Sequence, residues 1–164
     1  MKTVTQKLKV VNNYIDNASV PIQVVPLAND LGIKVYNTPW PDNISGKIQK
    51  DQQRGGDSGF AIFVNKNHHK NRRRFTIAHE IAHYVLHEDK IGDGVFDDAL
   101  YRSGLSNRAE TQANALAADI LMPWRILNKY VETHGNDVSM LADLFEVSKS
   151  AMRIRLGVPV DADW

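Results

Sequence analysis

The spacing of apolar residues predicts two helices and three strands in the first 65 residues. Residues 3–17 carry apolar positions three or four apart, which is typical of an amphipathic helix, and residues 26–31 form a short helical turn. Residues 33–36 alternate like a strand, and residues 45–50 are a second candidate. Residues 60–65 are continuously apolar and rich in β-formers, so they predict the strongest strand.

The remainder of the pattern is helical. An almost wholly apolar helix is predicted over residues 75–87. Ser106 and Asn107 cap a helix over residues 108–122, and another over residues 124–134 ends at a glycine.

Residues 139–156 have the pattern of a helix-turn-helix. Ala142 is small where two helices would cross, Val147 and Ser148 supply the turn and the cap, and Met152 faces inward. Three cations of the second helix could contact phosphate: Lys149, Arg153 and Arg155.

Composition bounds the class of protein. A chain of 164 residues, 43% hydrophobic and 24% charged, fits one globular domain. Twenty Lys and Arg against 19 acidic residues give a net charge of +1, so packing of the C-terminal helices on the core, or holding a substrate, is favoured over DNA binding. The N-terminus lacks the apolar core of a signal peptide and no apolar run approaches membrane-spanning length, which predicts a cytoplasmic protein without a membrane partner.

The 75–87 segment contains the motif H-E-x-x-H. His79 and His83 lie four residues apart, so on a helix their imidazoles leave the same face and can hold one metal ion. Glu80 projects about 100° away and is free to act as a base. The alternative is a pair of hydrogen-bonded core histidines, but burying three polar side chains in an apolar helix is costly unless something pairs with them.

A third ligand must come from elsewhere in the chain. The absence of cysteine excludes thiolate sites, so any zinc must be held by histidine and carboxylate. The acidic candidates downstream of the motif are Glu88, Asp89, Asp93, Asp97, Asp98, Glu110 and Asp119. Glu88 and Asp89 lie too close to the motif to swing back, whereas Glu110 lies on a helix rich in alanine that can pack tightly against the first. Asn114, one turn further along, shares that face and could orient a ligand. His87 is interpreted as a supporting or core histidine.

Other segments leave alternatives open. The 60–65 strand is either an edge of the active-site cleft that pairs with an extended substrate or a plain core strand. The basic run at residues 66–74 is interpreted as a solvated turn and first helical turn, with a patch for an acidic or nucleic-acid partner as the alternative; its adjacent His68 and His69 diverge and are not counted as ligands.

Candidate second donors to an oxyanion are Tyr84, Tyr101, Tyr130 and His134. The acid-rich residues 88–104 are a candidate lid.

The motif H-E-I-A-H at 79–83, followed by E-T-Q-A-N-A-L-A-A-D-I-L-M-P at 110–123, resembles the ImmA/IrrE family of metallopeptidases. The likeness extends to residues 25–35 and to the F-x-V-N before the basic run, with Ala82 in place of a common glycine and Leu116 and Ile120 in place of frequent Phe and Leu. It implies a compact, zincin-like α+β fold, mostly helical with a small sheet. Residues 1–135 would form the peptidase core, and residues 136–164 a helix-turn-helix-like pair packed on it.

The resemblance also implies a zinc peptidase with His79, His83 and Glu110 as ligands and Glu80 as catalytic base; manganese or iron are alternative metals. Family members act inside bacteria or their mobile elements, often cleaving a helix-turn-helix repressor to release transcription. Two alternatives remain. The first is a non-catalytic regulatory or toxin–antitoxin protein with a structural metal that binds through its C-terminal helices. The second is a peptidase that stays latent until a partner or metal loading switches it on.

Overall fold

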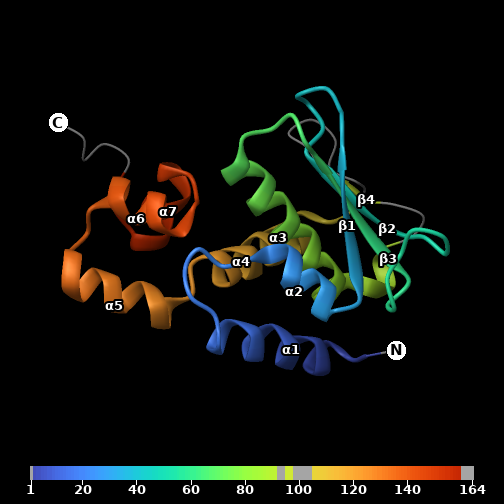
Figure 1. Cartoon of the computed structure of the whole chain (residues 1–164), viewed down its shortest axis with the longest axis horizontal. Helices are drawn as coiled ribbons and strands as arrows, with labels where there is room; N and C mark the ends of the chain where they lie inside the picture. The colour runs from blue at the N-terminus through green and yellow to red at the C-terminus, as the bar shows by residue number, and fades with distance from the viewer. Residues whose placement is uncertain (1, 92–94, 98–104, 160–164) are drawn as a thin grey trace.

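The structure, a computed structural model, describes residues 2–91, 95–97 and 105–159 and confirms the predicted α+β class (Figure 1). Helices predominate, and the strands form one small sheet. The helices are α1 (Val4–Asp16), α2 (Val24–Asp30), α3 (Lys70–His87), α4 (Asn107–Leu121), α5 (Trp124–His134), α6 (Val138–Phe145) and α7 (Lys149–Leu156), with a short 3-10 turn η1 (Glu88–Lys90). The strands are β1 (Ile33–Thr38), β2 (Gly46–Lys50), β3 (Phe60–Asn65) and β4 (Val95–Asp97).

Strand β3 lies inside the sheet, whose order is β1-β3-β2-β4. It pairs in parallel with β1 and antiparallel with β2, so both of its edges are occupied. All six of its residues are buried. The interpretation of β3 as an edge of the cleft is therefore wrong, and the alternative of a plain core strand is correct. A continuous apolar run indicates burial on both faces, which is what an interior strand requires.

Asn65, the last residue of β3, holds the loop between β1 and β2. Its side chain is fully buried, and its amide nitrogen donates to the carbonyl oxygens of Trp40 (3.1 Å), Pro41 (2.9 Å) and Ile44 (2.7 Å). Its amide oxygen accepts from the backbone N–H of Asn67 at 2.9 Å. One side chain thus satisfies several backbone groups of a loop whose prolines prevent regular pairing.

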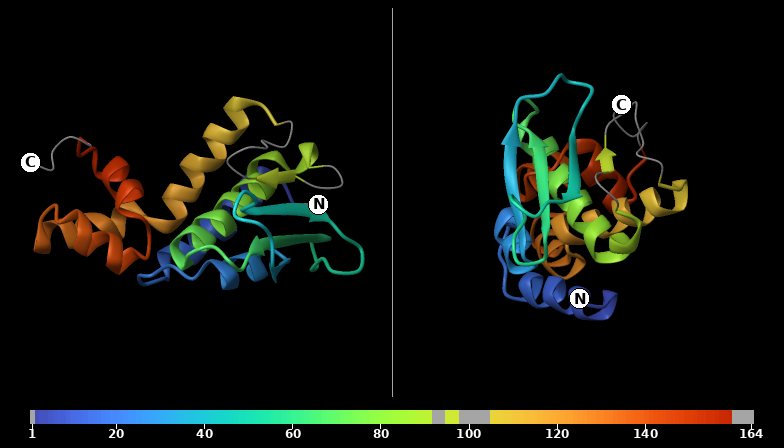
Figure 2. Two further views of the ribbon diagram at one scale, coloured as in Figure 1. Left: turned by 90° about the horizontal axis from the view of Figure 1, so that it is seen from above. Right: turned by 90° about the vertical axis from the view of Figure 1, so that its right-hand side faces the viewer.

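Helix α3 covers one face of the sheet, and α4 packs over α3 (Figure 2). The α3–α4 contact is the most extensive between helices. Both helices carry small buried residues: Ala78 and Ala82 in α3, and Ala109, Ala113 and Ala117 in α4. Alanine at a helix crossing allows the backbones to approach closely, which brings the polar side chains of the two helices into contact.

The first helix fixes the far end of α3 through a buried lysine. Lys7 is 2% exposed, and its ammonium donates to the carbonyl oxygen of Tyr84 at 3.1 Å. It also lies 2.6 Å from Glu88 Oε1 and 4.3 Å from the centre of the Tyr84 ring. Glu88, which sequence proximity excludes as a metal ligand, is thus the counter-ion of Lys7.

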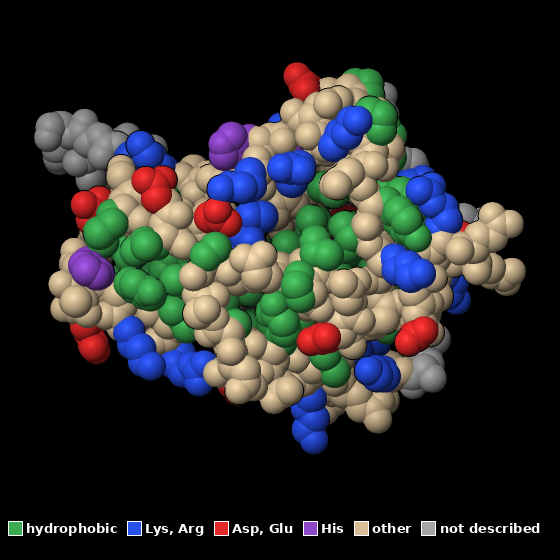
Figure 3. All heavy atoms as spheres, in the orientation of Figure 1, with side chains coloured by type: hydrophobic (Ala, Val, Ile, Leu, Met, Phe, Trp, Pro, Cys, Tyr) green, Lys and Arg blue, Asp and Glu red, His purple; other side chains and the backbone are tan. Residues whose placement is uncertain are grey.

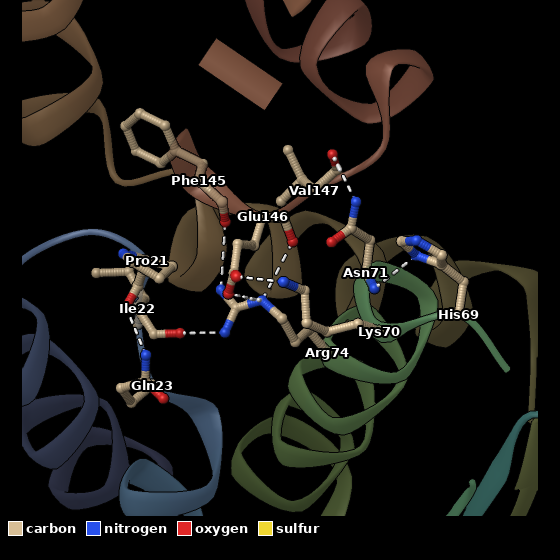
Figure 4. A network of polar contacts seen from close by, with 10 residues as sticks. All are labelled: Pro21, Ile22, Gln23, His69, Lys70, Asn71, Arg74, Phe145, Glu146 and Val147. Atoms are coloured by element: carbon tan, nitrogen blue, oxygen red, sulfur yellow. Dashed lines mark hydrogen bonds and ion pairs between the residues drawn. The ribbon is translucent and has the colours of Figure 1, made fainter. Parts of the chain in front are cut away.

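Arg74 joins α3 to the C-terminal helices (Figure 4). Its guanidinium donates to the carbonyl oxygens of Ile22 (2.7 Å), Phe145 (3.2 Å) and Glu146 (3.1 Å), and only 8% of the residue is exposed. Burial lowers the pKa of Arg74, and the nearby Glu146 carboxylate partly offsets this effect. The interpretation of residues 66–74 as a solvated basic run is wrong for this residue, because its long side chain reaches inward between two segments.

The C-terminal pair has the predicted helix-turn-helix-like form. Glu146 adopts a left-handed conformation with φ of 52°, and Ser148 caps α7 by accepting from Ala151 N–H. Met152 is fully buried. Arg155 does not extend toward solvent as a phosphate contact would require, because it donates to the Met122 carbonyl at 3.0 Å and to Asp119 at 2.9 Å. Across the described ranges, no helix is long and apolar enough to cross a membrane.

Asn65→Ala should lower the free energy of unfolding by about 2–4 kcal/mol, because several buried backbone groups lose their partner together. Urea denaturation followed by circular dichroism measures the change. Asn37→Ala is the matched control, since Asn37 is exposed on β1 and should change stability by less than about 0.5 kcal/mol. Equal effects of the two substitutions would contradict the role given to Asn65.

Candidate metal centre

Helices α3 and α4 bring three potential metal ligands together. Nε2 of His79 lies 3.1 Å from Glu110 Oε2, and Nε2 of His83 lies 3.1 Å from Glu110 Oε1. One ligand atom from each residue falls within 4.8 Å of the others, and all three residues are buried. Within the described residues this is the one such cluster of His, Cys, Asp or Glu that could hold a metal ion.

Local sequence explains how each ligand reaches the cluster. The four-residue spacing places His79 and His83 on the α4-facing side of α3. Ser106 begins α4 by accepting from the Ala109 N–H at 3.2 Å, which places Glu110 in the first helical turn. A carboxylate near a helix N-terminus is stabilised by the helix dipole. The predicted third ligand therefore lies at a position suited to an anion.

Hydrogen bonds on the far side of each imidazole determine which nitrogen faces the cluster. The Oδ1 of Asn114 accepts from His79 Nδ1 at 2.8 Å. The Oε1 of Gln112 accepts from His87 Nε2 at 2.9 Å, so in neutral His87 the other nitrogen, Nδ1, is an acceptor. That Nδ1 lies 3.1 Å from Nδ1 of His83, which must then donate. Both His79 and His83 consequently turn Nε2 toward Glu110. A metal ion would take the lone pair of that nitrogen, and a proton in the ion's place makes it a donor to the carboxylate.

This donor set fits a divalent metal ion. Two imidazole lone pairs and a carboxylate converge on one point, and such a set without thiolate suits zinc, with manganese or iron able to use the same donors. Burial alone would raise the pKa of the Glu110 carboxyl, but hydrogen bonds from His79 and His83 and their charges lower it well below its usual range. Glu110 is therefore ionised at neutral pH.

Glu80 lies beside the cluster without belonging to it. Its side chain is fully buried, and Oε1 lies 4.0 Å from Nε2 of His79. A carboxylate at this position is next to the centre but outside the group of three ligands, an arrangement that suits a base.

The remaining predicted residues divide by location. His87 contacts His83 and lies outside the three-residue group. Tyr84 faces α1, with Lys7 over its ring, and Tyr130 packs against Phe145 and His134. Tyr101 and most of the proposed lid lie outside the described residues.

The sequence does not single out Gln112. Helical phase from Glu110 points to Asn114, and Gln112 is rotated by about 160° from Glu110. Its long side chain nevertheless reaches His87. An amide-bearing residue on α4, next to a third histidine one turn beyond the motif, is the signal that could have identified it.

Comparisons with known proteins identify the family and the fold. A sequence profile of the IrrE N-terminal-like domain, a peptidase family, matches residues 28–157. A radiation response metalloprotease IrrE of Deinococcus radiodurans is 37% identical over 95 residues, covering 55% of this chain and 28% of that protein. The chain thus corresponds to little more than a quarter of the length of this curated relative. A transcriptional regulator of Mycobacterium tuberculosis shares the fold, with a TM-score of 0.60 over 96% of this chain and 48% of that chain at 17% identity.

The profile match extends over most of the chain and includes α3, α4 and the C-terminal helices. The protein belongs to the family of peptidases with an IrrE N-terminal-like domain.

Proposed function

We propose that the protein is a zinc-dependent endopeptidase. The observation that carries the proposal is the convergence of His79, His83 and Glu110 beside the buried Glu80. A bound zinc ion would supply a Lewis acid that polarises the substrate carbonyl and lowers the pKa of a water molecule toward neutrality. His79, His83 and Glu110 would hold the ion.

Glu80 would carry the proton. Its carboxylate accepts a proton from the attacking water and passes it to the nitrogen of the cleaved peptide bond. Its burial next to His79 restricts its side chain to the vicinity of the reacting atoms. The other supporting residues are Asn114, which orients His79, and His87 with Gln112, which orient His83.

We further propose that the substrate is a transcriptional repressor of the helix-turn-helix type inside a bacterial cell, with cleavage releasing transcription. Support comes from the family and from the similarity to a radiation response metalloprotease. DNA binding by this chain is not favoured, because Arg155 of α7 is held by Met122 and Asp119. We also propose residues 1–135 as the peptidase core, with residues 136–164 packed on it, which the Arg74 contacts support.

A second candidate function is a binding protein whose metal is structural and whose C-terminal helices recognise a partner. The exposed Ile154 on α7, 76% accessible, is the observation in its favour. A binding protein of this kind differs from the peptidase because it needs no catalytic base.

Glu80→Gln should lower cleavage of the repressor by about 10²- to 10⁴-fold, because the amide keeps the volume and removes the base. Gel analysis of purified zinc-loaded protein incubated with the repressor encoded beside it measures the loss. Metal analysis should show unchanged zinc content, and Glu132→Gln on the exposed surface of α5 should cleave normally. An intact repressor that co-elutes with wild type and variant alike would favour the binding protein.

His87→Phe, Gln112→Leu and Asn114→Ala should each weaken zinc binding by about 10- to 100-fold, because an imidazole that loses its partner is no longer held in the ligating tautomer. Competition with a chelator measures the affinity independently of activity. His134→Phe, at an exposed histidine, should leave it unchanged. Wild-type affinity in Gln112→Leu would contradict the chain of hydrogen bonds through His87.

A further inference from the structure

A large groove runs from the candidate centre toward the C-terminal helices. It encloses about 950 Å³ and lies between the first turns of α3, the second half of α4, and α7. We refer to it as the α3–α4–α7 groove. Both the peptidase helices and the helix-turn-helix-like pair contribute to its walls.

Most of the groove is apolar. Ala115, Ala118 and Ala151 leave space because their side chains are small. Trp124 (45% exposed) and Ile154 (76% exposed) also line it. These are two of the four large apolar residues that are exposed in the described part of the chain. Exposed apolar residues gathered around one hollow indicate a binding surface.

The groove is continuous with the candidate metal centre. Asn114 lines the groove and accepts the hydrogen bond of His79. Phe75 also lines it, and the centre of its ring lies 6.2 Å from the centre of the His79 ring. A ligand in the groove would therefore lie next to a substrate peptide bond at the centre.

The charged side chains that line the groove are cationic. They are Arg72 and Arg155, the latter paired with Asp119 at 2.9 Å, and none of the described lining residues is a carboxylate. Lys, Arg and His side chains gather over the first turns of α3 beside the C-terminal helices, with an acidic side chain next to them (Figure 3). An apolar occupant with acidic residues on its flanks is the complementary chemistry.

The residues that line the groove indicate the backbone conformation of its occupant. The described lining residues come from helices and their flanking turns, and none belongs to a strand of the sheet. An extended peptide there would leave its own N–H and C=O groups without a strand to pair with, whereas a helix satisfies them internally.

We propose that the α3–α4–α7 groove binds an amphipathic, acid-flanked helical segment of the protein substrate and positions a neighbouring peptide bond at the centre. This inference rests on the proposed peptidase function. It gives the C-terminal helices the role of a substrate-binding wall.

The test uses full-length, zinc-loaded Glu80→Gln protein, so that binding is measured without cleavage. The probe is a fluorescent peptide of about 16 residues with leucines at helical spacing and glutamates on its flanks. A scrambled peptide and a peptide with lysines on the flanks serve as controls. Fluorescence anisotropy should show the tightest binding for the glutamate-flanked helix.

In the same protein, Ile154→Glu and Ala115→Trp should each weaken binding of this probe by at least about tenfold, by adding a charge to or filling the groove. Val25→Glu is the matched control, because Val25 is 41% exposed and lies outside the groove. Arg72→Glu should shift preference toward the lysine-flanked peptide. Unchanged folding is verified by circular dichroism.

Equal binding of scrambled and helical probes, or unchanged binding in both groove variants, would overturn the proposal. Dimerisation of the protein that Ile154→Glu abolishes would overturn it in favour of a second copy as occupant. If the groove variants weaken peptide binding but wild-type protein leaves the repressor intact, the result would contradict the peptidase function and not the groove. Cleavage of the repressor at equal KM by wild type and Ile154→Glu would contradict the groove and not the peptidase.

Discussion

The close approach of α3 and α4 is the constraint on which the other features of the structure depend. Two histidines and a glutamate are buried between these helices, a costly arrangement unless their charges and lone pairs are matched. Alanines at the crossing allow the carboxylate of Glu110 to reach both imidazoles. A larger residue at Ala113 or Ala117 would force the helices apart and separate ligands that now lie about one hydrogen bond from one another. The sheet, in turn, supplies a rigid surface for α3.

The same pair of helices explains why the imidazoles are so well defined. Glu110 of α4 lies between the Nε2 atoms of His79 and His83 of α3. Asn114 and Gln112 of the same helix bind the far sides of the His79 and His87 rings. One helix therefore supplies one of the three proposed ligands and also the groups that orient the other two. Helix position, histidine tautomer and ligand direction are consequences of a single packing arrangement.

Sequence reasoning identified the features that depend on local pattern. The helical spacing of His79 and His83 and the alanine-rich surroundings of Glu110 were sufficient to place these residues together, and the caps at Ser106 and Ser148 located helix starts. Strand order was different, because the apolar run of β3 indicates burial but not which strands pair with it. Arg74 was misjudged because its acceptors at residues 22, 145 and 146 come from distant segments. The partners of Arg155 could not be identified from the sequence for the same reason, since Asp119 and Met122 are more than 30 residues away in the chain.

The contacts of Arg74 bear on how such chains are assembled in evolution. A segment can be exchanged between proteins as a module when its boundary crosses few buried polar interactions. A cut before α6 would remove two of the three carbonyl acceptors of a buried guanidinium, together with its nearest carboxylate, Glu146. The helix-turn-helix-like pair is therefore tied to the peptidase helices by buried polar contacts, unlike a unit that could be separated at its boundary. An insertion that moves the backbone at residues 145 and 146 should therefore disturb Arg74 more than a side-chain change that leaves these two carbonyl groups in place.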